Sequence, residues 1–465
     1  MNTSAPPGWR LAKLSDVADI RLGKMLSAKA RAEGLRQLPY LRNENVRWGR
    51  IDTSDVKLMG FTETELDRYQ VRHGDLLVCE GGEPGRCAVY VGNSLVMYQK
   101  ALHRVRCSPS VSPYFLAYWF RRFTSTRAVA SRVSQTTIAH LPLEEMRELV
   151  LAIPSRKTQD EIVAEIEKHF TRLDAAVASL KQARAKLKAY RASVQWSVFL
   201  GRVAPEATGD VSQSAKALLG QASQRRRAEW EAQFIGGRRR GWKEPTEPDP
   251  TRWPVPGGWG VVSIGMIGRP VINAIKAGPF GSSIKKNSYV AAGYKVYGQE
   301  QVIRGDSTFG SYYISGEHFE RLKSCAISPG DVLVSLVGTT GRVLVLPPDA
   351  EPGIINPRLI KISPDRSLIR PEYLKLYLEG PLARSFFAQK AHGQTMDVLN
   401  LSILSRLPIL LPPPAVQDRI ISELSLTASV SATIERTLAE SLIRVGAMRR
   451  AILARAFAGQ LVEAN

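Results

Sequence analysis

The chain has 465 residues and a formal net charge of +21, because 64 Lys and Arg residues outnumber 43 Asp and Glu residues. This charge indicates a polyanionic partner, most often nucleic acid, although a basic surface without a specific partner would give the same balance. The length predicts two to four domains, and no apolar segment resembles a signal peptide or is long enough to cross a bilayer, so we expect no membrane-spanning helix.

Residues 1–153 form a first predicted globular domain that is rich in short strands. Residues 38–41 are predicted to form a strand that leads into the polar stretch 42–45. A buried strand at 76–78, a glycine-rich loop at 80–86 and a returning strand at 87–91 predict a β-hairpin. Further along, we expect one strand over residues 98–105, a helix over 113–123 and a last strand over 149–153.

Residues 154–203 are predicted to form one long helix of a coiled coil. Apolar residues recur every seven positions at Ile166, Leu173, Leu180, Leu187 and Val194. Thr158 and Glu161 have the spacing of a capping box at the helix start, and Gly201 stands where a left-handed C-terminal cap is expected. At about 1.5 Å per residue, roughly 40 helical residues make a rod about 60 Å long.

Residues 204–252 are predicted to form a linker, because Gly, Ser, Pro and Ala are frequent there and two arginine triplets interrupt the stretch. Residues 224–234 predict a short helix within it. Residues 245–256 are expected to be extended, since prolines recur and disfavour helix.

The second half of the chain repeats the first. Residues 253–411 echo the first globular domain loosely, and residues 412–465 echo the long helix in register, since Pro412 and Gly459 follow Pro154 and Gly201 at the same offset. The seven-residue positions of the second helix are Leu424, Leu438, Val445 and Ile452, interrupted by Ser431, and Ile420, Ile434 and Met448 fill the alternate positions. Two helices packed in one core remain an alternative to a coiled coil.

The two halves differ in their loops rather than in their framework. Residues 80–82 read Glu-Gly-Gly, whereas the corresponding residues 336–338 read Leu-Val-Gly. The polar stretch 43–45 reads Asn-Glu-Asn, whereas the corresponding stretch 299–301 reads Gln-Glu-Gln. Recognition usually resides in loops on a rigid scaffold. Two copies of one scaffold with different loops therefore predict two readers of different targets.

The sequence offers little that indicates catalysis. Residues 338–342 lack the lysine and spacing of a phosphate-binding loop, and the Asn/Asp-Pro-Pro-aromatic tetrapeptide of amino-methyltransferases is absent. The six histidines and four cysteines have no metal-ligand spacing, and Glu80 with Glu83 is a weak signal for acid–base chemistry. We therefore expect no catalytic residue, metal or cofactor on this chain, and the scarcity of cysteine fits a cytoplasmic protein.

Polar and basic residues cluster in the predicted loops and strand ends of both domains. Asn and Gln can pair bidentately with adenine, Arg can do so with guanine, and Lys and Arg neutralise phosphates. For each residue alone, a solvated loop side chain is an equally good reading. The candidate DNA-binding residues are Arg42, Asn43, Asn45, Arg47, Arg86, Gln99, Lys100, Gln299, Gln301, Thr339, Thr340, Arg342, Asn356, Arg358, Gln394 and Thr395.

The whole chain resembles the specificity subunits of type I restriction–modification systems. The resemblance is carried by residues 74–82, by residues 98–105, by residues 410–414 leading into Gln417, and by residues 226–231 in the linker. It covers both domains, both long helices and the linker. It implies two target-recognition domains of mixed α/β fold, each reading one half of a split DNA site, separated by two long antiparallel coiled-coil helices that act as a ruler.

The resemblance also implies partners. Two modification subunits would bring S-adenosylmethionine and methylate adenine, and restriction subunits would bring ATP- and Mg²⁺-dependent translocation and cleavage, while this chain would hold no cofactor. Gain or loss of a heptad in the ruler would shift one domain by roughly 10 Å, about three base pairs. The second helix departs from the family pattern, because Thr427, Ser431 and Ser441 lie on its apolar face and put its packing register in doubt.

Two other functions fit parts of the sequence. A complete DNA methyltransferase would require the isolated chain to bind S-adenosylmethionine, and the missing tetrapeptide argues against it. A coiled-coil scaffold that binds only proteins explains the long helices, but it explains neither the duplicated domains with different polar loops nor the charge of +21.

Overall fold

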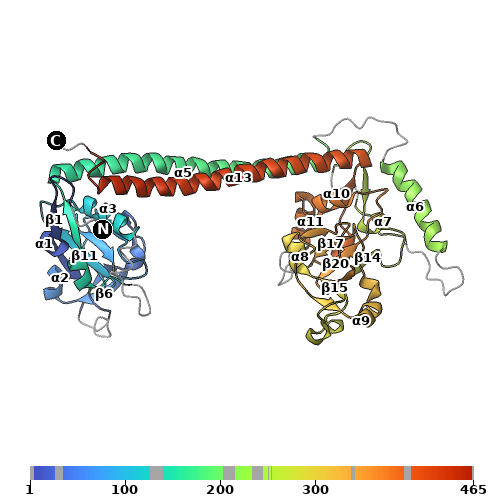
Figure 1. The fold of residues 1–465 in the computed structure, drawn as a ribbon, viewed down its shortest axis with the longest axis horizontal. Coiled ribbons are helices and arrows are strands. Elements are labelled where there is room, and N and C mark those ends of the chain that lie inside the picture. The colour runs from blue at the N-terminus through green and yellow to red at the C-terminus, as the bar shows by residue number, and fades with distance from the viewer. Residues whose placement is uncertain are drawn as a thin grey trace. The chain divides into compact units, whose positions relative to one another are not determined.

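The computed structural model describes residues 5–26, 35–125, 140–202, 215–232, 244–249, 251–252, 254–336, 341–391 and 399–462. The chain divides into two compact units, one of residues 1–183 with 436–465 and the other of residues 184–435. Each unit contains one mixed α/β domain and parts of the two long helices that join the domains, which confirms the predicted fold class (Figure 1). Within the ranges described here, no helix is long and apolar enough to span a membrane.

The first domain is built on two four-stranded sheets. One is antiparallel throughout, with the spatial order β2 (Ala18–Leu22), β11 (Leu102–Cys107), β8 (Leu76–Cys79) and β9 (Cys87–Val89). It contains the predicted hairpin, β8–β9. The other has the order β6 (Lys57–Phe61), β3 (Arg36–Leu41), β10 (Val96–Tyr98) and β7 (Gln70–Val71), with β3 and β10 parallel.

Among the described residues, two short ribbons and five helical segments complete the first domain. One ribbon pairs β1 (Arg10–Lys13) with β12 (Val150–Ile153), and the other pairs β4 (Val46–Arg47) with β5 (Arg50–Ile51). The helices are α1 (Leu14–Val17), the 3₁₀ turn η2 (Asn43–Asn45), α2 (Glu63–Tyr69), α3 (Pro113–Thr124) and α4 (Leu143–Arg147). The predicted helix 113–123 is confirmed as α3, which begins with proline in its first turn and buries Phe115, Leu116 and Phe120.

The prediction of a single strand over residues 98–105 is wrong. The segment contributes the end of β10 and most of β11, which belong to different sheets. Between them Ala101 has a φ of 98°, a conformation that breaks a strand. The alternating pattern of the segment is compatible with one strand or two, so the sequence did not indicate the break.

The second domain repeats this layout in unit 2. A four-stranded antiparallel sheet has the order β14 (Ile275–Ala277), β20 (Leu359–Ile362), β17 (Val332–Ser335) and β18 (Val343–Val345). A three-stranded sheet has the order β16 (Tyr313–Ile314), β15 (Tyr294–Tyr297) and β19 (Gly353–Ile355), with β15 and β19 parallel. A ribbon of β13 (Gly260–Val262) and β21 (Ile409–Leu411) corresponds to β1–β12.

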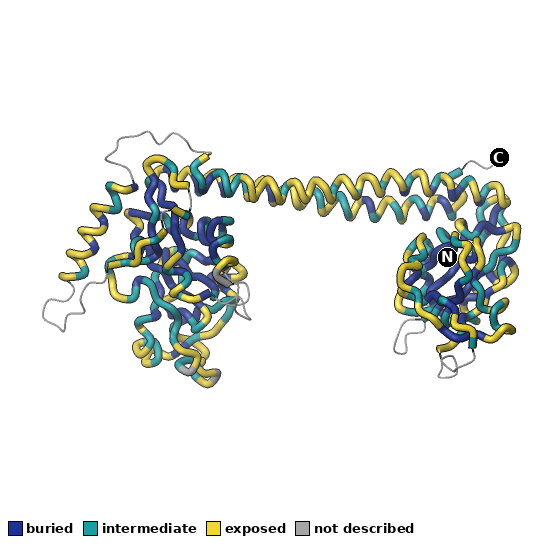
Figure 2. Tube along the Cα trace, turned by 180° about the vertical axis from the view of Figure 1, so that it is seen from behind, coloured by how far each residue is buried: buried dark blue, intermediate teal, exposed yellow. Residues whose placement is uncertain are grey.

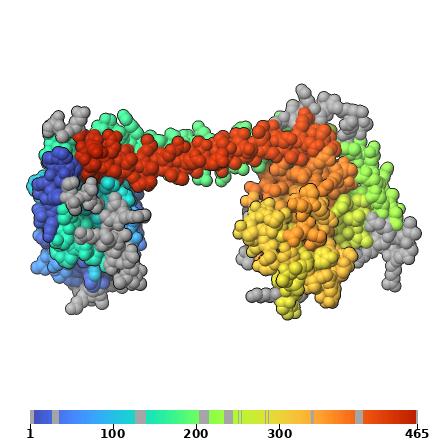
Figure 3. Space-filling view, viewed as in Figure 1, coloured from blue at the N-terminus to red at the C-terminus, as the bar shows by residue number. Residues whose placement is uncertain are grey.

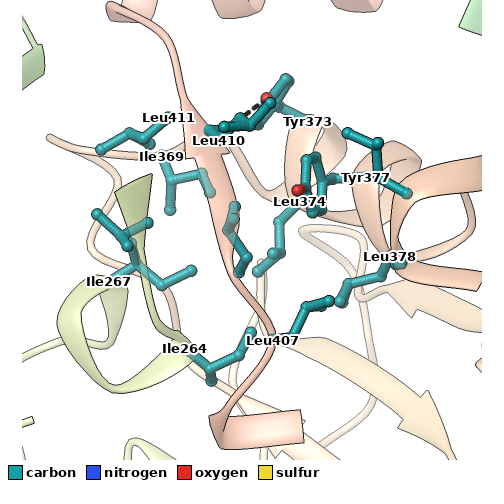
Figure 4. Close-up of a cluster of buried hydrophobic side chains, with 14 of the residues drawn as sticks. Ile264, Ile267, Ile369, Tyr373, Leu374, Tyr377, Leu378, Leu407, Leu410 and Leu411 are labelled. Carbon is teal, nitrogen blue, oxygen red and sulfur yellow. Dashed lines mark hydrogen bonds between the residues drawn. The ribbon is translucent and has the colours of Figure 1, made fainter. Parts of the chain in front are cut away.

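The helical elements of the second domain lie around these sheets and enclose its core. They are α7 (Ile264–Ile267), η5 (Gly281–Ser283), η6 (Lys286–Ser288), α8 (Gln299–Arg304), α9 (Gly316–Arg321), η7 (Lys323–Cys325), α10 (Pro371–Leu378), α11 (Pro381–Ala391) and α12 (Leu401–Ser405). Figure 4 shows part of the core, where α7, α10 and β21 contribute apolar side chains. Within it the Tyr373 hydroxyl donates to the Leu410 carbonyl at 2.6 Å, so the buried phenol is satisfied.

A helix in the middle of the chain packs on the second domain. The short helix predicted over 224–234 is longer and begins earlier, as α6 (Ala215–Ala232). Ala215 and Ala222 are buried, and the Arg226 guanidinium donates to the carbonyls of Gly265 and Met266 in α7. Figure 3 shows α6, in green, against the flank of this domain. Small residues two turns apart, together with Arg226, thus dock a helix that lies within the predicted linker.

The two long helices are α5 (Arg156–Phe199) and α13 (Pro414–Ala456). The capping box predicted at Thr158 is wrong, because the helix starts earlier and the Thr158 amide donates to the Ser155 hydroxyl at 3.2 Å. The left-handed caps are confirmed, with φ values of 68° at Gly201 and 71° at Gly459.

Burial along the long helices follows the seven-residue pattern (Figure 2). On α13 the side chains of Leu424, Ser431 and Val445 are buried, so the small Ser431 keeps the register. The alternate positions predicted at Ile434 and Met448 are wrong, since they are 41% and 56% exposed. The helix segments are ion-paired within each unit, by Asp174 with Arg449 in unit 1 and by Arg191 with Glu435 in unit 2.

Candidate DNA interface

Three turns meet at one end of the sheets of the first domain. They are residues 42–45 after β3, residues 80–86 between β8 and β9, and residues 99–101 between β10 and β11. The Gln99 amide donates to the Leu41 carbonyl at 3.0 Å, and the Glu80 amide donates to the Ala101 carbonyl at 2.9 Å. Backbone hydrogen bonds therefore hold together three segments that are far apart in sequence.

The turn that follows β3 uses two of the candidate residues to hold its own shape. The side-chain amide of Asn45 is buried. Its oxygen accepts from the Arg42 backbone N–H at 2.8 Å, and its nitrogen donates to the backbone carbonyls of Asp52 and Asp55, both at 2.9 Å. The Arg42 guanidinium lies 2.9 Å from the carboxylates of both Glu44 and Asp55. These two side chains are engaged within the loop.

The glycine-rich turn 80–86 lies directly against the first turn. The Asn43 side chain donates to the Gly81 carbonyl at 3.0 Å, and the Arg86 guanidinium donates to the Asn43 carbonyl at 3.0 Å. Arg86 also pairs with Glu83 at 3.1 Å. Gly85 has a φ of 87°, and a Cβ there would lie 2.6 Å from Thr124 of α3, so only glycine fits this position without rearrangement.

The remaining candidates of the first domain are more accessible. Arg47 is exposed on β4, opposite the exposed Arg50 of β5. Gln99 and Lys100 are half-buried, and the Lys100 backbone amide donates to the Lys24 carbonyl at 2.7 Å. These side chains stand beside the two engaged turns and supply polar and cationic groups at this end of the domain.

The second domain brings three equivalent turns together. They are residues 298–301 after β15, the described residues Leu336, Gly341 and Arg342 between β17 and β18, and residues 356–358 between β19 and β20. The backbone N–H of Asn356 donates to the Tyr297 carbonyl at 2.8 Å, and the backbone N–H of Leu336 donates to the Arg358 carbonyl at 3.0 Å. The arrangement matches that of the first domain, although α8 replaces the 3₁₀ turn η2.

The side chains of these turns again divide into engaged and accessible groups. Gln301 is buried, accepts from the Gly298 amide at 2.9 Å and donates to the Phe309 carbonyl at 2.8 Å. Gln299 is half-buried and donates to the Ser335 hydroxyl at 2.9 Å. Arg358 is exposed.

Two further candidates lie at the edges of these turns. The half-buried Asn356 accepts from the Arg358 amide at 2.9 Å. Arg342 is exposed, with its guanidinium 3.9 Å from the Glu379 carboxylate. The structure thus brings Gln299, Asn356 and Arg358 together and places Arg342 directly before β18. Four candidates, Thr339, Thr340, Gln394 and Thr395, lie outside the described residues.

Two buried ionisable groups lie on or next to the strands that carry the turns. Asp331 is buried at the start of β17, where it accepts from the Ser328 amide at 2.8 Å, and burial raises the pKa of its carboxyl. In the first domain His103 is fully buried on β11 with Nε2 2.9 Å from the Leu141 carbonyl, and burial lowers the pKa of its imidazole. His103 lies two residues after the turn 99–101, whereas Asp331 lies at the end of β17 opposite to the end at Ser335.

Sequence reasoning missed the carboxylates and aromatic groups that surround the arginines. Trp48 donates from its indole nitrogen to Glu83 at 2.8 Å, and Asp55 and Glu83 neutralise Arg42 and Arg86. The contacts of Trp48 with Glu83 and of Arg42 with Asp55 join segments that no sequence spacing brings together, whereas Glu83 and Arg86 lie three residues apart within the turn 80–86. Among the described residues, no group of three or more His, Cys, Asp or Glu side chains could hold a metal ion.

Comparisons with known proteins identify this architecture. The family model described as the type I restriction modification DNA specificity domain matches residues 6–189 and 276–442, which is more than half of the chain. The chain therefore belongs to the family of type I restriction–modification specificity subunits. The resemblance identified from the sequence is thus confirmed.

Two curated relatives come from Escherichia coli. The specificity subunit of the type I restriction enzyme EcoBI is 22% identical over 335 residues, which cover 72% of this chain and 63% of that protein. The specificity subunit of EcoKI, from strain K12, is 25% identical over 196 residues, which cover 41% of this chain and 42% of that protein. The chain thus matches less than two thirds of the length of these relatives.

Two solved structures share the fold across the whole chain. One, described as the structural basis of complex assembly and conformational transition of the type I R-M system, has a TM-score of 0.66 at 18% identity, covering 98% of this chain and 99% of its own. The HsdS subunit from Thermoanaerobacter tengcongensis has a TM-score of 0.54 at 17% identity, covering 99% of both chains. At these identities the likeness concerns the fold.

Proposed function

We propose that this specificity subunit reads a two-part DNA site, one part with each domain. The observation that carries the proposal is the duplicated meeting of three turns, which places different polar side chains on the same framework. A half-site read by Asn43, Gln99 and Arg86 would differ from one read by Gln299, Asn356 and Arg358, because the asparagine, the glutamine and the arginine stand at different positions of the turns in the two domains. The site would therefore be asymmetric.

The candidate residues fall into two proposed roles. Those with accessible side chains (Arg47, Gln99, Lys100, Gln299, Arg342, Asn356 and Arg358) would contact bases or phosphates. The buried amides of Asn45 and Gln301, and the ion-paired Arg42, would shape the turns that present them. Asn43 and Arg86 join two turns, so each would connect readout to loop shape. The four candidates outside the described residues stay in the proposal as contacts.

We also propose that this chain does no chemistry of its own. Two modification subunits would bind it and supply S-adenosylmethionine and adenine methylation, and restriction subunits would supply ATP- and Mg²⁺-dependent cleavage. The chain would direct these partners to the site. The two long helices would set the distance between the half-sites, because a helix has a fixed rise per residue.

Methylation mapping tests this function. The chain and the modification subunit encoded beside it are produced in a host that lacks DNA methylation, and modified bases are sequenced across the genome. We expect a two-part motif with a fixed gap that disappears when this chain is omitted. A continuous motif, or methylation that persists without this chain, would contradict the proposal.

A further inference from the structure

A half-buried arginine in unit 1 lies between two aromatic rings beside the recognition turns. Arg121 belongs to the last turn of α3, and its guanidinium carbon lies 5.8 Å from the centre of the Trp48 ring and 5.2 Å from that of Phe170. Within the part of the chain that the structure describes, its guanidinium donates no hydrogen bond. Aromatic rings orient a guanidinium but leave its in-plane N–H donors open to an anion.

A second arginine concentrates positive charge at the same place. Arg449 of α13 lies over the same Phe170 ring, with its guanidinium carbon 5.5 Å from the ring centre, and it bonds to Asp174 of α5. The Asp174 carboxylate raises the pKa of Arg121, and Arg449 already pairs with this carboxylate. Burial lowers the pKa of Arg121, and the charge of Arg449 lowers it further. Two cations thus share one carboxylate.

This cluster is continuous with the recognition turns of the first domain. Trp48 contacts Arg121 with its ring and donates to Glu83 in the turn 80–86. Gly85 of that turn packs against Thr124, which follows Arg121 by one helical turn. An anion bound at Arg121 would therefore lie beside the groups proposed to read DNA.

The corresponding position of the second domain carries the opposite charge. Counting from the prolines that start α3 and α10, Pro113 and Pro371, Arg121 corresponds to Glu379. The Glu379 carboxylate accepts from the Val343 amide at 3.1 Å and lies 3.9 Å from Arg342. The positive charge at this position is therefore a feature of the first domain and is not required by the shared framework.

We propose that Arg121, supported by Arg449, binds a backbone phosphate of DNA next to the half-site of the first domain. This inference rests on the proposed function. A phosphodiester fits because it brings an anionic acceptor to open guanidinium donors, and because DNA proposed to lie on the three turns would bring a phosphate to the same surface. The contact would position the duplex without reading its sequence.

The test uses the complex with the modification subunit and a duplex that carries the mapped motif, or a scrambled one. Binding constants are measured at several salt concentrations for the unaltered complex and for Arg121→Ala and Arg121→Lys. We expect Arg121→Ala to weaken binding about tenfold at low salt, equally for both duplexes. The slope of log K against log salt should fall by about 0.9, so a fourfold rise in salt shrinks the difference about 3.5-fold. Arg121→Lys should keep the slope, and the methylated motif should not change.

Arg68→Ala is the matched control, because Arg68 lies 5.2 Å from the Tyr69 ring on α2, an element that contributes nothing to the three turns. We expect this variant to leave the slope unchanged, and an equal change in both variants would overturn the proposal. A lower melting temperature for Arg121→Ala with an unchanged slope would show that Arg121 only packs the rings. Loss of the modification subunit from the Arg121→Ala complex would show that Arg121 binds a carboxylate of that subunit and would overturn the proposed phosphate contact. If the unaltered complex bound both duplexes equally, the proposed function itself would fail.

Discussion

In each unit a buried glutamine of the long helix forms hydrogen bonds with the domain, and its removal should destabilise that unit alone. Gln159 of α5 is fully buried. Its side-chain oxygen accepts from the Ser112 amide at 2.8 Å, and its nitrogen donates to the carbonyls of Ser110 and Pro154 at 2.9 and 3.0 Å. Gln417 of α13 makes the same three bonds in unit 2, with Arg370, Leu368 and Pro412 at 2.7, 2.8 and 2.9 Å.

The cost of losing this amide follows from the groups that it leaves behind. Gln159→Ala strands one backbone N–H and two carbonyls in a buried site, and an unsatisfied buried group costs about 1–3 kcal/mol. Since one side chain satisfies all three groups, we expect unit 1 to lose about 3–5 kcal/mol of unfolding free energy. Gln159→Glu should lose more, because its carboxylate keeps the acceptor but faces two carbonyl oxygens.

Hydrogen exchange of peptides around residues 108–116 and 154–163 measures this loss locally, which avoids treating two units as one transition. Gln417→Ala should give a loss of similar size around residues 366–374, with unit 1 unaffected. The control is Gln182→Ala, since Gln182 is exposed on α5 and its removal should change stability by no more than about 0.5 kcal/mol. Equal protection in Gln159→Ala and Gln182→Ala would refute the reasoning.

Three further predictions follow from individual contacts. Gly201→Ala should lower the melting temperature of unit 2, because the φ of Gly201 is 68° and a Cβ there would lie 2.5 Å from Pro256. Gly220→Ala, with open space around this position of α6, should instead raise the unfolding free energy of unit 2 by up to about 1 kcal/mol. A loss of stability in both variants would contradict this prediction. Because burial lowers the His103 pKa below the ordinary 6.5, the unfolded chain binds the proton more tightly than the folded chain does. The unfolding free energy of unit 1 should therefore decrease as pH falls below about 6.5, by at most about 1.4 kcal/mol per pH unit. Urea titrations of His103→Gln should lack this decrease. Asn45→Ala should reduce the stability of unit 1, since it leaves buried backbone carbonyls without a donor. Arg47→Ala should weaken DNA binding by the complex and leave stability unchanged. Calorimetry and binding assays measure both effects, and the reverse result would make Asn45 the DNA contact and Arg47 the structural residue.

Much of the fold could be predicted because its signals are periodic or local. The seven-residue repeat of α5 and the proline at the start of α3 each specify an element without help from distant residues. The break at Ala101 could not be predicted, since an alanine with positive φ is held by the hydrogen bonds of neighbouring turns rather than by its own preference. The docking of α6 depends on Arg226 reaching the carbonyls of α7, a contact between distant segments.

The candidate interface was predicted as a set better than as single residues. Polar turn residues were found because turns are rich in them, and the structure brings most of those described into two clusters. Sequence could not separate Asn45 and Gln301, whose amides are used inside their turns, from the exposed Arg47 and Arg358. That separation depends on burial, which neither residue type nor spacing specifies. Arg121 was missed because its partners, Trp48 and Phe170, lie on other elements.

The central claim is that each domain reads its own half of the site. The most direct measurement is methylation mapping with two variants of the complex, Arg47→Ala with Gln99→Ala in the first domain, and Arg342→Ala with Arg358→Ala in the second. We predict that each pair relaxes the sequence of one half of the methylated motif, a different half for each pair, and leaves the other half and the gap unchanged. Relaxation of both halves by either pair, or an unchanged motif in both variants, would contradict the account.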